Sequence, residues 1–421
     1  MICLVKSKAR CPQNFPNKDN DMLHSSQVQD YADVLLWGLK TARTARYQKG
    51  DIVLLRFDKE ALPVAEALQK KLLQAGMQPL ARMNSTPLMD VQFYEEAGPK
   101  QLVFIAPGEK ELCESLNGAI YLYAPESLTH LSHIDPSRIG KAAVARKGLR
   151  GILDQREMAG DFGWTLGMVP TLELARQAKT SLATYTRHWL KACYLDTADP
   201  VGQWKELHRR ASALKKWLNS LEPVRFHVTS ARTDLIITPG AQRRWIGVSG
   251  HNIPSFEVFL SPDWRGTEGT YYADQPSFRS GNYVKGVTLT FKKGKVVASE
   301  AEEGAEFLKK QLTMDAGACR LGEFSLTDRR FSPINRFMAN TLFDENFGGR
   351  YGNCHVAVGA SYADTFSADA KTLTPQLKES LGFNDSALHW DLVNTEKKTV
   401  TATLASGNEI VIYKDGEFLG L

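Results

Sequence analysis

The sequence predicts a mixed α/β fold, with an N-terminal α/β domain on a mainly parallel sheet and a C-terminal α+β domain. Between residues 51 and 124, short apolar runs alternate with helical spacing, which is typical of βαβ units. Beyond about residue 225 the chain becomes rich in short strand patterns separated by turns. With 421 residues, it is also longer than one ordinary domain. We therefore expect two domains, residues 1–225 and 226–421.

The N-terminal half starts with polar residues 1–21, which we expect to be a loosely ordered extension. Either Met1 or Met22 could be the residue at which translation starts. Helical spacing begins near Val28. The run DIVLLRF predicts a buried strand, and EALPVAEALQKKLLQAG predicts a helix ending at Gly76. Three further strands are predicted at QPLARM, QLVFIA (101–106) and GAIYLYA (118–124). No GxGxxG follows the first strand, so this texture does not by itself imply a dinucleotide.

A helical region is predicted from about residue 165 to Glu222-Pro223, where the proline stops it. Its apolar residues follow a three-four spacing and form one stripe, at Trp204, Leu207, Ala211, Leu214, Leu218 and Leu221. Such a stripe is more often core than a partner surface. The basic residues of the same region are most simply a solvated helix face, at Arg209, Arg210, Lys215 and Lys216.

The C-terminal half contains strand patterns and one clear helix. TDLIITPG (233–240) predicts a strand, and VTLTFKKGKVVAS (287–299) predicts a hairpin that turns at Lys-Lys-Gly-Lys. Residues 399–421 predict a meander, and EEGAEFLKKQL (302–312) predicts the helix.

Composition limits the classes of function. The net charge is only +5 and the basic residues are scattered, which argues against a nucleic-acid partner. No run of eighteen apolar residues is present, so no membrane span is expected. The six cysteines show no CxxC spacing, which fits free thiols in a reducing compartment. We therefore expect a cytoplasmic protein.

Histidines and carboxylates of the C-terminal half stand in strand patterns. In HWDL, His389 and Asp391 are two residues apart, so in a strand both side chains point to one side and can hold one divalent cation. Glu257 in SFEVF and Glu323 in RLGEFSL are charges among apolar strand formers, and such charges need a partner or a metal. Each feature alone is more often a surface pair, a satisfied core group or a residue on the wet face.

The segment DENFGGRYGNCHVAVGASY (344–362) adds Glu345, His355 and Tyr362 on a glycine-rich backbone that can approach a ligand closely. A turn or helix cap is an equal explanation for Glu345, and a core position for Tyr362. Cys354 would point away from His355 in a strand, into the core. Taken together, four carboxylates and two imidazoles without a thiolate suit a pair of Zn²⁺-like ions. We therefore predict a dinuclear metal site in the C-terminal domain.

These motifs resemble, in the same order, those of the thermophilic-type metallo-aminopeptidases, the M29 peptidase family. The matching segments are NIPSFEVFLSPD, GVTLTFKKGKVV, DAGACRLGEFSL, ANTLFDENFGG, GNCHVAVGASY and HWDL. The resemblance covers residues 230–421 well, whereas the N-terminal half is similar only in its βαβ texture. It implies that the metal ligands are Glu257, Glu323, Glu345, His355, His389 and Asp391. It also implies an active-site tyrosine at Tyr362.

The resemblance implies an aminopeptidase that hydrolyses the N-terminal bond of peptides with a free N-terminus. A water activated between two divalent ions, Zn, Co or Mn, would be the nucleophile. Glu323 is expected to bridge the ions and Tyr362 to bind the oxyanion. Glu257 and Glu345 are both candidates for carrying a proton to the leaving amine, and Glu257 is favoured, so Glu257, Glu323 and Tyr362 are the expected catalytic residues. The family also implies a homodimer that encloses the site.

Two alternatives stay open at this point. The first is a ring-cleaving dioxygenase with a single iron on the same scaffold, which needs fewer carboxylates. The second is a non-catalytic binding protein that kept the fold, which the complete ligand set disfavours because buried charges are costly without a metal.

Overall fold

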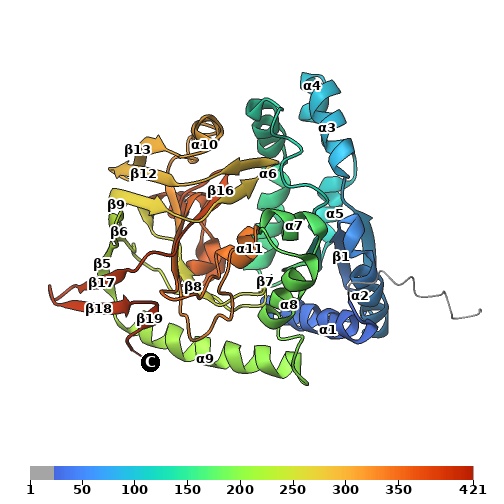
Figure 1. Ribbon diagram of the computed structural model, residues 1–421, viewed down its shortest axis with the longest axis horizontal. Helices are drawn as coiled ribbons and strands as arrows, with labels where there is room; N and C mark the ends of the chain where they lie inside the picture. Colours follow the sequence, from blue (N-terminus) through green and yellow to red (C-terminus); the bar gives the residue numbers. More distant parts are fainter. Residues whose placement is uncertain (1–22, 421) are drawn as a thin grey trace, which may run out of the picture.

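The computed structural model describes residues 23–420 (Figure 1). The expectations for residues 1–21 and for Met22 fall outside this range. The structure combines one parallel sheet with antiparallel sheets, which confirms the predicted mixed α/β fold class.

The N-terminal region is built on a five-stranded parallel sheet in the order β2-β1-β3-β4-β7. Its strands are β1 (Ile52–Phe57), β2 (Gln78–Met83), β3 (Gly118–Tyr123), β4 (Gly163–Met168) and β7 (Asn252–Ile253). Side chains of β1 alternate between two apolar clusters: Val53, Leu55 and Phe57 join the main core, while Leu54 packs with Ala119 on the other face. A continuous apolar run such as IVLLRF therefore forms a strand that is covered on both faces.

Helices surround this sheet (Figure 1). They are α1 (Ser25–Ala42), α2 (Leu62–Gln74), α3 (Pro87–Glu96), α4 (Pro99–Leu102), α5 (Glu109–Ser115), α6 (Pro136–Met158), α7 (Leu172–Gln177), α8 (Leu182–Ala192) and α9 (Pro200–Ser220), with a 3-10 turn η1 (Lys59–Ala61) before α2. α1 packs on α2 and β4, and α5 packs on α6. The predicted stripe of α9 is buried from Trp204 to Leu218, so it is core as expected.

Two sequence predictions in this region are wrong. QLVFIA is not a strand, because Gly98-Pro99 starts the short helix α4, and Val103 and Phe104 beyond it are 46% and 63% exposed. Residues 165–168 belong to β4, although the helical region is predicted to begin there. β4 lies between β3 and β7, so pairing on both edges outweighs its weak local preference.

The C-terminal region consists of two larger antiparallel sheets and a small hairpin. An eight-stranded sheet has the order β13-β12-β9-β6-β5-β17-β18-β19, and a four-stranded sheet has the order β16-β15-β14-β8. The first contains β5 (Pro223–Thr229), β6 (Asp234–Thr238), β9 (Asp263–Ala273), β12 (Val287–Lys292), β13 (Lys295–Glu300), β17 (Thr399–Leu404), β18 (Glu409–Lys414) and β19 (Glu417–Phe418). The second contains β8 (Glu257–Leu260), β14 (Leu321–Thr327), β15 (Asn353–Gly359) and β16 (His389–Asn394).

The remaining elements are the hairpin β10 (Ser277–Arg279) and β11 (Asn282–Val284), helices α10 (Ala305–Leu312), α11 (Thr341–Asp344) and α12 (Pro375–Ser380), and 3-10 turns η2 (Ala363–Thr365) and η3 (Ala370–Thr372). The predicted hairpin at 287–299, the meander beyond 399 and the helix at 302–312 are all present, the helix with its start at Ala305.

The four-stranded sheet packs one face against the eight-stranded sheet. The hydroxyl of Tyr271, on β9, lies 2.9 Å from the carbonyl oxygen of Cys354 and 2.7 Å from that of Leu392. Every residue of β14 and β15 is buried. The packed face holds the apolar side chains of these strands, which leaves the opposite face for polar groups.

The division of the chain at residue 225 stays a prediction. β7, which lies beyond it, completes the parallel sheet by pairing with β4, and one apolar core contains residues of both halves. Within residues 23–420, no helix has the length and apolar composition needed to cross a membrane.

Candidate metal centre

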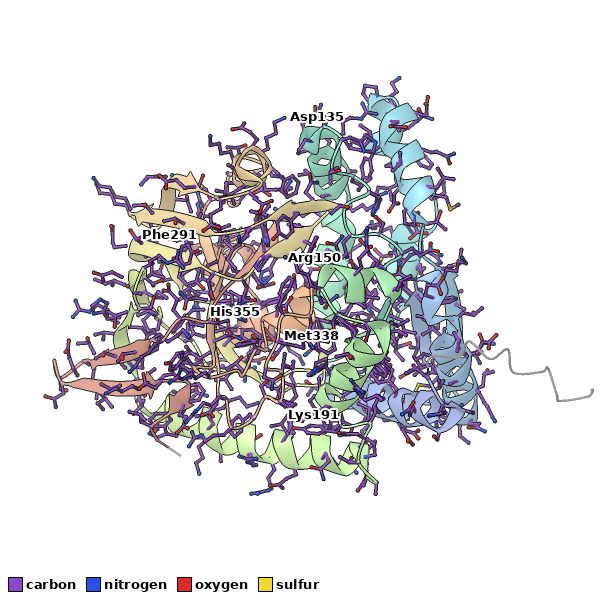
Figure 2. All side chains as sticks on the ribbon, in the orientation of Figure 1. Asp135, Arg150, Lys191, Phe291, Met338 and His355 are labelled. Carbon is purple, nitrogen blue, oxygen red and sulfur yellow. The ribbon has the colours of Figure 1, made fainter. Side chains whose placement is uncertain are left out.

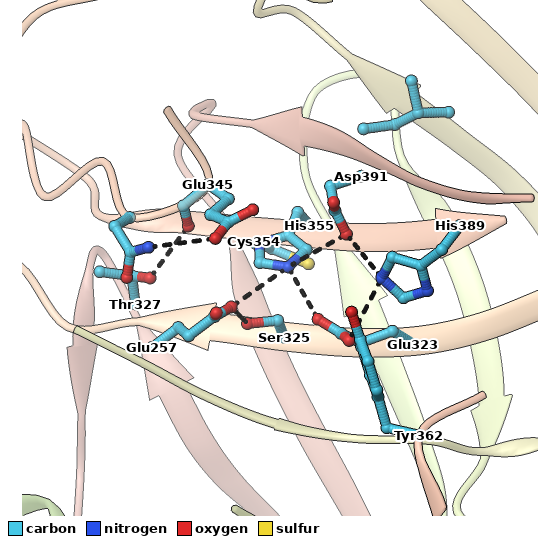
Figure 3. A network of polar contacts seen from close by, with 12 residues as sticks. Glu257, Glu323, Ser325, Thr327, Glu345, Cys354, His355, Tyr362, His389 and Asp391 are labelled. Atoms are coloured by element: carbon cyan, nitrogen blue, oxygen red, sulfur yellow. Dashed lines mark hydrogen bonds and ion pairs between the residues drawn. The ribbon is translucent and has the colours of Figure 1, made fainter. Parts of the chain in front are cut away.

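The polar face of the four-stranded sheet brings together residues from four strands (Figure 3). Side chains alternate along β14, β15 and β16, so Val356 and Leu392 join the core while His355 and Asp391 point the opposite way. Glu323, on β14, lies on the same polar face. The alternation that the sequence shows in LGEFSL, NCHVAVG and HWDL therefore produces one polar face over an apolar core.

Small residues of β15 leave space between the site residues. Ala357 is in register with Glu323 on one side and with Asp391 on the other, and Gly359 is in register with His389. Gly359 has φ +107°, and a Cβ there would stand 2.1 Å from the carbonyl oxygen of Leu388. Only glycine fits at this position, which gives one of the glycines of the sequence motif a physical reason.

Glu323 lies between the two histidines. Its Oε1 is 3.0 Å from Nε2 of His355, and its Oε2 is 3.7 Å from Nε2 of His389. Nε2 of His355 is also 3.2 Å from Oε2 of Glu257, and Nε2 of His389 is 3.3 Å from Oδ1 of Asp391. These contacts form a continuous polar network across β8, β14, β15 and β16 (Figure 3).

Two groups of donor atoms within this network are compact enough to hold an ion each. In each group the donor atoms all lie within 4.8 Å of one another, and Glu323 belongs to both. The first group is Glu257, Glu323 and His355, and the second is Glu323, His389 and Asp391.

Glu345 lies beside the network but in neither compact group. It follows α11, and its Oε1 is 3.4 Å from the amide nitrogens of Asn252 and Asn346. Burial raises the pKa of Glu345 well above its ordinary value, and the charges of Glu257 and Asp391 add to this. The carboxylate is therefore within electrostatic range of the network, at its edge.

The donor set fits divalent cations. Within residues 23–420, no lysine or arginine forms an ion pair with Glu257, Glu323, Glu345 or Asp391. Burial raises the pKa of Glu257 and of Glu323 to about 8, which reflects carboxylates in low dielectric without enough positive charge. Oxygen and imidazole donors suit Zn²⁺, Co²⁺ or Mn²⁺, and such ions would supply the missing charge.

Both histidines direct Nε2 toward the carboxylates, as metal ligands would. Nδ1 of His389 lies 2.9 Å from the carbonyl oxygen of Ala360, so an Nδ1–H donor there leaves Nε2 free as a ligand toward Asp391. Nδ1 of His355 is buried and has no hydrogen-bond partner among the described residues, whereas its Nε2 faces the carboxylates.

Tyr362 stands at the mouth of the network. Its ring lies 4.6 Å from that of His389, and its hydroxyl points toward Glu323 (Figure 3). Burial, followed by the charges of Glu323 and Asp391, raises the pKa of Tyr362 well above its ordinary value. The hydroxyl therefore keeps its proton and can donate a hydrogen bond.

The centre opens into a cleft of about 1620 Å³. Residues of β8, β14 and β16 line one side of the cleft, and residues of α6 line another. Figure 2 labels Arg150 on α6 and His355 on the four-stranded sheet. Arg150 of α6, Trp164 of β4 and Asp364 of η2 line it together with Glu323 and Asp391. A cleft of this size admits a peptide chain.

Sequence reasoning missed the residues that support the ligands. Ser325 donates its hydroxyl to Oε2 of Glu257 at 2.6 Å, and it is two residues beyond Glu323, so the same strand alternation could have found it. Arg279, on β10, donates to the carbonyl oxygen of His389 at 2.6 Å. Asn252 reaches Glu345 from β7, and no local pattern in the sequence marks it or Arg279.

A buried, cation-deficient set of carboxylates and imidazoles at a cleft is the arrangement expected of a metal centre. The chain belongs to the thermophilic metalloprotease family M29, whose sequence profile matches residues 24–418. It is accordingly an enzyme that hydrolyses peptide bonds with the help of a divalent metal.

Characterised relatives agree with this family. The chain is 28% identical over 396 residues to Aminopeptidase 2 of Geobacillus stearothermophilus, covering 88% of this chain and 94% of that protein. It is 30% identical over 314 residues to Aminopeptidase T of Thermus aquaticus, covering 69% and 73%. The structure of wild-type AmpT from Thermus thermophilus aligns with a TM-score of 0.74 at 21% identity, covering 93% of this chain and 99% of that one, so the two share a fold.

Proposed function

We propose that this protein is an aminopeptidase that removes the N-terminal residue from peptides with a free N-terminus, using two divalent ions. The observation that carries the proposal is the pair of compact donor groups that share Glu323 at the floor of a peptide-sized cleft. These relatives are all named aminopeptidases, which supports cleavage at the N-terminal residue.

The proposed ligands follow from the two groups. Glu257 and His355 would hold one ion and His389 and Asp391 the other, with Glu323, which belongs to both groups, as the shared ligand. Glu345, on which the charge of Glu257 acts, is the sixth proposed ligand. Zn, Co and Mn all suit such oxygen and nitrogen donors.

When bound, the metal pair polarises the scissile carbonyl and provides a water of lowered pKa. Glu257, which Ser325 holds by one oxygen, is the proposed carrier of a proton to the leaving amine. The hydroxyl of Tyr362 donates a hydrogen bond to the oxyanion that develops on the substrate carbonyl.

Metal analysis combined with an activity screen tests this function. The purified protein should contain about two divalent ions per chain and should cleave unblocked dipeptides and leucine p-nitroanilide, but not their N-acetyl derivatives. A single iron per chain with turnover of a dihydroxypyridine would favour the dioxygenase alternative. Absence of any bound divalent ion would favour the non-catalytic alternative.

We also propose a cytoplasmic homodimer. Four cysteines among residues 23–420 are free thiols and three of them are buried, which fits a reducing compartment. Large apolar side chains are exposed around α3 and α4, at Leu88, Met89, Val103 and Phe104, and such residues suit an interface. Light scattering should give twice the mass of one chain, and a monomer would refute the dimer.

A further inference from the structure

One carboxylate in the wall of the cleft is not needed for the proposed metal ligands. Asp364 lies in the 3-10 turn η2, two residues after Tyr362, and lines the same cleft as Glu323 and Asp391. Its backbone is held firmly: its carbonyl oxygen accepts from Nε of Arg244 at 3.0 Å, and the hydroxyl of Thr365 donates to the carbonyl of Tyr362 at 2.8 Å. The position of the side chain is therefore set by the fold.

The carboxylate of Asp364 forms no ion pair among residues 23–420, although the charges of His251 and Arg244 act on it and lower its pKa. Its Oδ1 is buried and has no hydrogen-bond partner among the described residues. The charged side chains around it are engaged elsewhere: Glu157 lies 2.6 Å from His251, and Arg244 donates its Nε to the backbone rather than to the carboxylate. A carboxylate oxygen that is buried without a hydrogen-bond donor is unfavourable, so such a site is suited to receive a donor from a ligand.

The side chain of Asp364 is also ionised at neutral pH, so it can attract a cation. Burial, followed by the nearby charge of Glu157, raises its pKa to about 6, so the group is mostly ionised at neutral pH. Its negative charge acts on Glu323, whose pKa it raises. The carboxylate of Asp364 therefore lies within electrostatic range of Glu323, which belongs to both donor groups.

The substrate of an aminopeptidase brings a cation to this place. Its α-ammonium group is separated from the scissile carbonyl carbon by one carbon atom, so it must lie beside the reacting bond. When the N-terminal residue is lysine or arginine, a second cation extends from the same residue. A carboxylate with a buried oxygen that lacks a partner among the described residues attracts either cation through a charge-assisted hydrogen bond.

We propose that Asp364 forms the subsite for the cationic group of the substrate's N-terminal residue. The inference rests on the proposed aminopeptidase function and assigns a specificity-determining residue to it. If the cation is the α-ammonium, Asp364 makes the enzyme select free N-termini. If it is the side-chain cation, Asp364 selects lysine and arginine at the first position.

The test compares Asp364→Asn with a matched control, Asp385→Asn. Asp385 lines the same cleft, but its side chain is 84% exposed and pairs with Lys147 at 2.7 Å, so the control removes the same charge from the rim. Leucine, lysine and arginine p-nitroanilides give KM and kcat. Calorimetry on the metal-loaded protein gives the binding of leucine amide and of 4-methylpentanamide, which lacks the amine.

Asp364→Asn should raise KM about tenfold or more, with kcat changed far less, and Asp385→Asn should leave both unchanged. An effect on all three substrates, with weaker binding of leucine amide only, identifies the α-ammonium. An effect confined to lysine and arginine substrates identifies the side chain. Asp364→Glu, which keeps the charge, should recover part of the loss, and melting and metal content show whether each variant is folded.

The proposal is overturned if Asp364→Asn behaves like Asp385→Asn on every substrate, or if its loss lies in kcat alone. The assignment to the α-ammonium is overturned if Asp364→Asn does not weaken the binding of leucine amide relative to 4-methylpentanamide, and the assignment to the side chain is overturned if the variant treats lysine and arginine anilides as it treats the leucine anilide. Failure of the proposed function is distinct, because the wild-type protein would then not cleave the anilides at all. Calorimetry with leucine amide, lysine amide and 4-methylpentanamide on the wild-type protein and on Asp364→Asn would still show whether Asp364 binds either cation.

Discussion

Oε1 of Glu323 lies 3.0 Å from Nε2 of His355, and the second oxygen of the same carboxylate faces the other histidine of the network. One side chain therefore links the two compact donor groups, because it is a member of both. Glu323→Gln should keep the fold and reduce peptide hydrolysis about 10³-fold, since the amide offers one donor oxygen instead of two and carries no negative charge.

Kinetics and elemental analysis check the Glu323→Gln variant together. Its metal content should fall below that of the wild-type protein. Glu379→Gln is the matched control, because Glu379 lines the cleft at an exposed position. Full activity of Glu323→Gln with an unchanged metal content would remove the bridging role.

Tyr362→Phe isolates the hydroxyl that points at the network. The variant keeps the ring contact with His389 but loses the donor for the oxyanion. We expect kcat to fall on the order of 10²–10³-fold with little change in KM, because this hydrogen bond forms mainly in the transition state. Tyr351→Phe, which lies outside the cleft lining, should have no effect. A change confined to KM would instead place the hydroxyl in ground-state binding.

Ser325→Ala removes the donor that holds Glu257. The hydroxyl is 2.6 Å from Oε2 of that carboxylate in a fully buried position. Groups that orient a ligand typically contribute 10- to 100-fold to metal affinity, so we expect a weakening of about that size. Competition with a chelator measures it, with Ser299→Ala on β13 as a distant control. Unchanged affinity would show that Glu257 is held by its other contacts alone.

Metal affinity should depend on pH in a defined direction. Burial raises the pKa of Glu257 and Glu323 to about 8, so the metal-free protein holds protons on these groups at neutral pH. A protonated carboxyl group is a poor ligand, so binding must release protons. Apparent affinity should therefore rise with pH up to about 8 and then level off.

Chelator competition at several pH values, corrected for the protonation of the chelator, measures this dependence. Calorimetry of metal binding in buffers of different ionisation enthalpy counts the protons released. Affinity that stays constant between about pH 6 and pH 8, or that falls as pH rises, would contradict the proposed ligand set.

Much of the site follows from strand alternation. His389 and Asp391 lie 3.3 Å apart because residues two apart in a strand share a side, and this requires no knowledge of the fold. The same rule would have found Ser325 from Glu323. Strand alternation does not predict which strands pair. The alignment of Glu323, Ala357 and Asp391 depends on the pairing register, which cannot be read from the sequence.

Other features depend on long-range packing and could not be predicted. Asn252 contacts Glu345 only because β7 joins the N-terminal sheet beside β4. Oδ1 of Asp364 is buried and has no hydrogen-bond partner among residues 23–420, and no pattern in the sequence around Asp364 indicates this. QLVFIA has the composition of a strand, yet the preceding Gly98-Pro99 starts a helix and leaves Phe104 exposed.

Diffraction from a crystal soaked in zinc, recorded at the zinc absorption edge, is the most direct test of the metal centre. We predict two anomalous peaks per chain. One should lie among Glu257, Glu323 and His355, and the other among Glu323, His389 and Asp391. A crystal without a peak on this face of the four-stranded sheet, from protein with full activity, would contradict the proposed centre.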